Sequence, residues 1–194
     1  DVHLHVARSS RVTSDYARAT RHLDCAERLL RERRRGGQGH ESLWLELQEQ
    51  RVWLAYMRRD IQGISPVLQR MAPAVRRRGS PTQLAAFYMW SANDLVLQNQ
   101  YQFSPTAVEQ ERRGVALLER AGALPELAMA RFDLAFMLIL GDLTHCDEAL
   151  SHLGQARKLA ERLCDPVLAT RAATYLAIAE RRLSHVSACR DWAR

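Results

Sequence analysis

Four stretches of this chain repeat one pattern, and that repetition limits the fold more than any single residue does. The blocks begin at Gly39, Gly79, Gly122 and Cys164, so the steps between them are 40, 43 and 42 residues. Each block runs from a small or turn-forming residue through an Ala/Leu-rich helix, a short break and a second, more charged helix. Periods of this length are typical of stacked helix-turn-helix units, which bury their apolar faces only against one another. We therefore predict an all-α, right-handed superhelix of about 4.5 antiparallel helix pairs, forming one domain over residues 1–194 with a partial repeat at 1–38.

Individual helices follow from apolar spacing and from start signals, and no β-branched run at period two predicts a strand. Ser80-Pro81, Ser104-Pro105 and Asp165-Pro166 each place a capping side chain before a proline suited to the first helical position. Pro73 should kink or divide its helix, and Gly141-Asp142 should form a tight turn. The expected helices cover residues 15–34, 41–59, 65–78, 81–100, 106–120, 126–140, 146–163 and 165–183, with a partial helix at 2–12 and an unfinished one from about 185.

Composition favours a folded cytoplasmic protein. Hydrophobic residues make up 47% of the chain, and the longest apolar run, 134–140, is too short to cross a bilayer. No signal-peptide pattern opens the chain. Cys25, Cys146, Cys164 and Cys189 lie far apart without a CxxC pair, as is typical of reduced thiols. Because the chain lacks an initiating Met and stops inside a helix-like segment, we expect it to be an excised piece of a longer protein.

The net charge of +6 is unevenly distributed and comes almost entirely from arginine. Residues 1–78 hold 16 arginines against nine acidic residues. Two arginine clusters fall in the last turns of predicted helices, where cations favourably meet the carbonyl end of the helix dipole. The alternative is a basic edge, formed by aligned helix ends, that meets an acidic partner or nucleic acid. Its members would be Arg33, Arg34, Arg35, Arg76, Arg77 and Arg78.

Histidine patterns are the first place to look for a metal site. His3 and His5 form an Asp-x-His-x-His start known from metal-dependent hydrolases, but the later strands and ligands of such a site are missing. His145, Cys146 and His152 could gather on one helix, although a helical His/Cys pair is usually a cap and a core thiol. We therefore predict no metal ligand.

Catalytic motifs are also missing. The chain contains neither a phosphate-binding glycine loop nor a nucleophile elbow. Paired carboxylates such as Glu109/Glu111 and Asp147/Glu148 fall in polar helix starts, where they favourably face the dipole. The sequence therefore predicts no catalytic residue, no cofactor and no enzymatic activity.

A family resemblance is carried by the tract from 141 to 183. Its marks are Gly141-Asp142, Glu148-Ala149, Ala156 with Ala160, and Cys164-Asp165-Pro166, together with the phrase TYLAIAERRL at 174–183. In these features the chain resembles the tetratricopeptide-like repeats, of the MalT type, found in large bacterial signalling ATPases. Those proteins are often fused to a nucleotide cyclase domain or a LuxR-type DNA-binding domain. One departure is Arg51, at a position that such repeats usually fill with Leu.

The resemblance implies a non-catalytic module that binds a protein, a peptide or a small effector on its concave side. First helices line that side in such repeats, and aromatic and Arg side chains make good anchors there. The same aromatic rings could instead fill the space between helices. The expected concave-face residues are Glu46, Glu49, Trp53, Tyr56, Met89, Asn93, Phe132, Phe136, Arg171, Thr174 and Arg181.

We expect this module to act in the cytoplasm, in signal transduction or transcription regulation, and to pass its bound state to fused ATPase or output domains without contacting a membrane. Two alternatives stay open at this point. The chain could be a freestanding oligomerisation scaffold that docks on another copy, or a nucleic-acid-binding repeat that uses the basic edge. An ATPase or DNA-binding domain encoded beside the segment would favour the signalling module.

Overall fold

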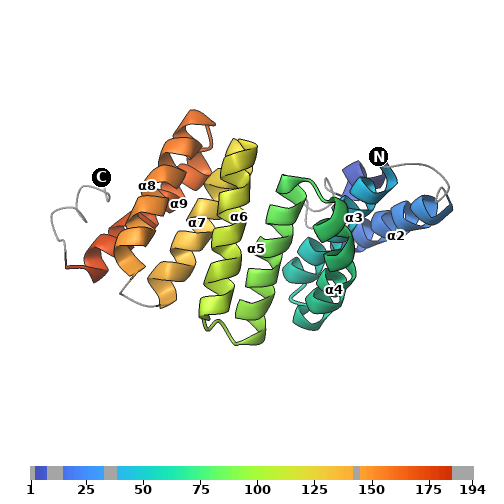
Figure 1. The fold of residues 1–194 in the computed structure, drawn as a ribbon, viewed down its shortest axis with the longest axis horizontal. Coiled ribbons are helices and arrows are strands. Elements are labelled where there is room, and N and C mark those ends of the chain that lie inside the picture. Colours follow the sequence, from blue (N-terminus) through green and yellow to red (C-terminus); the bar gives the residue numbers. More distant parts are fainter. Residues whose placement is uncertain (1–2, 8–14, 33–38, 142–144, 185–194) are drawn as a thin grey trace. The chain divides into compact units, whose positions relative to one another are not determined.

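The structure is a computed structural model that describes residues 3–7, 15–32, 39–141 and 145–184. These residues form helices and no strand, which confirms the predicted all-α class (Figure 1). None of the described helices is both long and apolar enough to cross a membrane. After a short helical segment at 3–7, the helices are α2 (Tyr16–Glu32), α3 (Gly39–Met57), α4 (Ile61–Arg78), α5 (Pro81–Gln98), α6 (Pro105–Ala121), α7 (Leu124–Gly141), α8 (Cys146–Arg162) and α9 (Pro166–Arg182).

Three predicted helix starts are confirmed by their caps. Ser104 Oγ and Asp165 Oδ1 each accept a hydrogen bond from the backbone N–H three residues on, at 3.2 and 2.9 Å. At the start of α5, the Gln83 N–H donates to Ser80 Oγ at 3.2 Å while the Ser80 N–H donates to Gln83 Oε1 at 3.0 Å. This reciprocal capping box satisfies two backbone donors at once. The expected boundaries therefore rest on local hydrogen bonds.

The helix that was expected at 65–78 starts earlier. Asp60 is its N-cap, and the Asp60 side chain accepts from the Gly63 N–H at 3.1 Å. The first turn of α4 therefore precedes Ser65.

Pro73 was expected to kink or divide this helix, and the division does not occur. α4 continues through both Pro66 and Pro73, which are exposed. Met71 and Val75 lie on either side of Pro73 and are only 2% and 1% exposed. Core packing on both sides of the proline therefore holds the helix together despite the missing N–H.

Other expected features lie partly outside the described residues. Gly141 ends α7, while its expected turn partner Asp142 is not among the described residues. The same holds for positions 8–12 of the partial first helix, for the end of the helix expected at 15–34, and for the unfinished helix from 185.

The chain divides into two compact units, Asp1–Asp94 and Leu95–Arg194, and the boundary falls inside α5. In the first unit α3 packs against α2 and α4. Arg51 of α3 pairs with Asp24 and Glu27 of α2, with both N–O distances at 2.7 Å. Arg51 therefore joins two helices through charge. The expectation of one repeat domain over all 194 residues stays a prediction.

In the second unit α7 is the central helix. It packs against α6, α8 and α9, so it is apolar around most of its circumference. Ala135 of α7 is completely buried. Gly122 ends α6 with φ 66°, a left-handed conformation that glycine adopts without strain.

Candidate functional site

Four aromatic rings form a cluster in the second unit. Phe136 of α7 lies edge-on to Phe103 and to Tyr175 of α9, with centroid separations of 6.1 and 5.3 Å. Phe132, one turn earlier, contacts Tyr175 at 5.4 Å and is only 1% exposed, whereas Phe136 and Tyr175 are partly exposed. The Arg171 guanidinium lies 4.4 Å from the centroid of the Phe132 ring. This cation–π contact fixes an exposed cation beside the cluster.

Three of the expected concave-face residues therefore come together in this unit: Phe132, Phe136 and Arg171. Of these, Phe132 supports the cluster from inside. Thr174 and Arg181 are exposed on α9, and the Thr174 hydroxyl donates to the Thr170 carbonyl at 2.9 Å.

The other expected concave-face residues belong to the first unit. Tyr56 is 42% exposed, and its ring lies edge-on to Trp90 at 5.7 Å between centroids. Asn93 Nδ2 donates to the Met89 carbonyl at 3.1 Å. The remaining three are partly buried and interact with other groups: Glu46, Glu49 and Trp53. A single band of these residues across all repeats stays a prediction.

Two carboxyl groups, Glu111 of α6 and Asp133 of α7, interact with each other. Glu111 is completely buried, and within the described residues neither of its carboxylate oxygens has a hydrogen-bond partner. Burial raises its pKa well above the ordinary value, and the nearby Asp133 raises it further. Burial also raises the pKa of Asp133 to about 7, against an opposing effect of Arg171. The expectation that Glu111 lies in a polar helix start was wrong, because this residue faces the core two turns into α6.

A charged pair joins α6 to α8. Arg112 Nε and Nη2 donate to the two oxygens of Glu148 at 2.9 and 2.7 Å. This bidentate geometry is the strong form of the arginine–carboxylate pair, and it lowers the pKa of Glu148. His145 Nδ1 and His152 Nε2 lie 3.7 and 3.8 Å from the Glu148 oxygens.

His152 extends this contact toward α7. Its Nδ1 lies 2.9 Å from Arg131 Nη1, and Arg131 also pairs with Glu119 of α6. Burial lowers the pKa of His152, and the charge of Arg131 lowers it further. The neutral imidazole is therefore favoured, with Nδ1 able to accept from Arg131.

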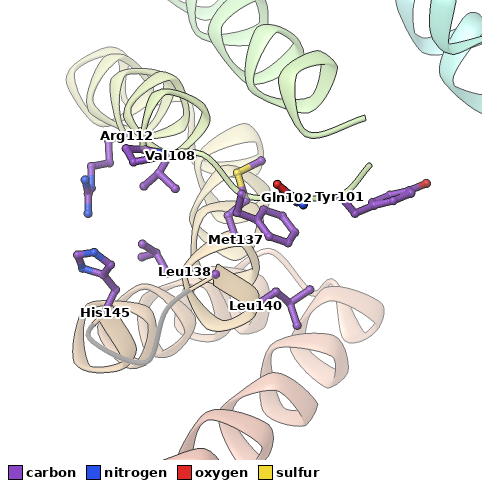
Figure 2. A pocket seen from close by; sticks show the side chains of 11 residues that line it. Tyr101, Gln102, Val108, Arg112, Met137, Leu138, Leu140 and His145 are labelled. Carbon is purple, nitrogen blue, oxygen red and sulfur yellow. The ribbon is translucent and has the colours of Figure 1, made fainter. Parts of the chain in front are cut away.

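A pocket of about 540 Å³ opens beside this charged pair, between the start of α6, the end of α7 and the start of α8 (Figure 2). Arg112 and His145 face each other at one end of it. Tyr101, which is 68% exposed, lies at the other end. The lining residues are Tyr101, Gln102, Phe103, Pro105, Val108, Arg112, Met137, Leu138, Leu140, Gly141 and His145.

The expected basic edge is only partly described. Arg76, Arg77 and Arg78 are exposed in the last turn of α4, while Arg33, Arg34 and Arg35 lie outside the described residues. The Arg76 guanidinium lies 5.8 Å from the centroid of the Phe87 ring. Arg77 and Arg78 reach the two oxygens of Glu41 at 3.7 and 3.1 Å. Their charge is therefore partly compensated within the chain.

The histidine patterns do not assemble into a metal site among the described residues. His3 Nδ1 lies 3.0 Å from His22 Nδ1, and His3 Nε2 lies 3.4 Å from Cys25 Sγ, while His5 is exposed. The two ring nitrogens of His3 face different neighbours, His22 and Cys25. These three side chains therefore do not point toward one position that a metal ion could occupy. Cys146 is buried and only 1% exposed.

Sequence reasoning missed the burial of Glu111, its interaction with Asp133, and the pocket. A signal for the acids was available: Glu111 interrupts the apolar stripe of α6, and Asp133 interrupts the apolar run of α7. The pocket gave no such signal, because its residues come from three helices and one loop. Comparison with known proteins finds no family model and no curated protein that matches the chain.

Proposed function

We propose that the chain is a non-catalytic helical-repeat module that binds a protein partner or a small effector within a bacterial signalling or transcription-regulating ATPase. The observation that best supports this is the agreement between the sequence repeat and the helix pairs. Gly79, Gly122 and Cys164 fall at the ends of α4, α6 and α8, between one pair and the next. Three of the four repeat starts in the sequence therefore coincide with the ends of helices.

In this proposal the pairs stack into a right-handed superhelix with first helices on the concave side. The contact between α7 and α9, first helices of consecutive pairs, supports the stacking. Scattering of X-rays in solution tests it, since a stacked array gives an elongated particle and a globular arrangement of the same mass does not.

The binding surface that we propose in the second unit is the exposed stripe of α7 and α9. It offers partly exposed rings, Phe136 and Tyr175, next to the fixed cation of Arg171. Aromatic and arginine side chains supply large contact areas at small entropic cost, as interface anchors do.

The experiment uses the complete polypeptide that contains this segment. Its ATPase rate is measured for the wild type, for Arg171→Glu and for the control Lys158→Glu, an exposed cation of α8. We expect Arg171→Glu to change the regulated rate while circular dichroism shows the same helix content, and Lys158→Glu to change neither. A complete reading frame without an ATPase would contradict the signalling assignment and favour the oligomerisation scaffold, which light scattering at increasing concentration detects.

A further inference from the structure

We propose that the pocket between α6, α7 and α8 binds a small carboxylic acid with an apolar body. The carboxylate would lie at the end formed by Arg112 and His145, and the apolar body would lie on Phe103, Met137 and Leu140 (Figure 2). This inference specifies a site and a ligand class for the effector-binding part of the proposed function and rests on it.

The lining of the pocket is divided about equally between polar and apolar surface. Phe103, Val108, Met137, Leu138 and Leu140 supply the apolar part. Its volume of about 540 Å³ lies in the range of small-molecule sites.

The rim of the pocket leaves apolar surface in water. Tyr101 and Leu140 are 68% and 45% exposed. An apolar ligand that covers them removes this surface from water and gains free energy in proportion to the area.

Hydrogen-bond donors lie at the end of the pocket opposite Tyr101. Arg112 uses Nε and Nη2 for Glu148, so the outer edge of its guanidinium, with Nη1, makes no hydrogen bond within the described residues. An arginine has five N–H donors and can hold two acceptors at once. Because Glu148 fixes the guanidinium, little entropy is lost when a second carboxylate binds.

The lining favours an anion over a cation. No Asp or Glu lines the pocket among the described residues, whereas Arg112 and His145 do. The Glu148 carboxylate, which pairs with Arg112 and lies 3.7 Å from His145, compensates part of this positive charge. The starts of α6 and α8 and the end of α7 reach the pocket, so two positive helix ends and one negative end lie there. The helix ends therefore act in the same direction as the side chains.

The test measures binding of three probes of equal length to the protein by isothermal titration calorimetry: octanoate, octanamide and octylamine. We expect octanoate to bind at least about tenfold more tightly than octanamide, since charge-assisted hydrogen bonds are stronger than neutral ones. Octylamine should show no measurable binding, because its ammonium would face Arg112. Equal affinities for the three probes, or no octanoate binding at millimolar concentration, would overturn the proposal.

Variants locate the binding site. Val108→Trp fills the pocket and Leu140→Glu places an anion at its rim, so each should weaken octanoate binding at least about tenfold. The matched control is Leu163→Glu, since Leu163 is also an exposed leucine, at 37%, and does not line the pocket. Circular dichroism confirms that each variant is folded. Unchanged binding by folded Val108→Trp would place octanoate elsewhere and overturn the inference, while a regulatory effect of Arg171→Glu would still support the proposed function.

Discussion

Glu111 is a carboxyl group at a position of α6 that would suit a leucine. A buried polar group without a hydrogen-bond partner costs about 1–3 kcal/mol of stability. Its pKa in the folded state is raised above the ordinary 4.5 by burial and by Asp133, so the protonated form favours folding. This stabilisation is complete below about pH 4.5 and is lost as the pH rises toward the folded-state pKa.

Replacing Glu111 with methionine should therefore raise the free energy of unfolding, by about 1–3 kcal/mol at pH 8 and by less at pH 4. Urea denaturation at the two pH values measures both gains. Glu109→Met is the control, because Glu109 is exposed on the same helix and should change stability little. A larger gain at pH 4 than at pH 8 would show that Glu111 is ionised and paired in the folded protein.

Asp133 offers a second test, because its environment has two opposing effects on its pKa. Burial raises this pKa to about 7, and the charge of Arg171 acts to lower it. We expect Arg171→Ala to raise the pKa of Asp133 above 7, as followed by NMR of the side-chain carboxyl carbon. Arg181→Ala, which removes another exposed cation of α9, should leave it unchanged. A lower pKa in Arg171→Ala would exclude the proposed direction of this interaction.

At the scale of the element, α4 shows how tertiary packing overrides a local signal. Pro73 removes a backbone donor from the helix interior, which usually costs about 3 kcal/mol. Pro73→Ala restores the N–H at an exposed position, and we expect it to raise the free energy of unfolding by about 1–3 kcal/mol. Chemical denaturation measures the gain, with Pro81→Ala as the control, because proline suits the first position of α5. A loss of stability in Pro73→Ala would mean that the proline fits a bend that the core requires.

The elements also show what the sequence could and could not predict. Helix starts at Ser80, Ser104 and Asp165 depend on residues three positions apart, so local reading found them. α4 stays continuous through Pro73 because Met71 and Val75 are buried in the core. That burial depends on other helices, so the local sequence pattern does not predict it.

The candidate site was less predictable for the same reason. The cluster around Phe136 joins two expected residues to Tyr175 and Phe103, neither of which the repeat register selected. The pair of Arg112 and Glu148 spans 36 residues in sequence. Contacts of this kind follow from how helices pack, and periodicity fixes only which face of each helix is buried.

At the scale of the whole molecule, the proposed repeat array predicts how cooperatively the helix pairs unfold. Stability in such an array is a sum of units and their nearest-neighbour interfaces, so damage to one pair should spread only to its neighbours. Ala135 is completely buried in α7, which packs against α6, α8 and α9, and an aspartate there is a buried, unpaired charge. Such a charge costs several kcal/mol.

We therefore expect Ala135→Asp to unfold α6 to α9 at a lower temperature than the helices of the first unit. Tryptophan reports the difference, because Trp44, Trp53 and Trp90 all belong to that first unit and Trp192→Phe removes the fourth. Far-UV circular dichroism, which follows all helices, should lose part of its signal before the tryptophan emission shifts. Ser151→Asp, at an exposed position of α8, is the control and should keep the two curves together. Coincident curves in Ala135→Asp would instead mean that the chain unfolds as one cooperative domain, since α5 runs without interruption across the boundary between the units and could couple them.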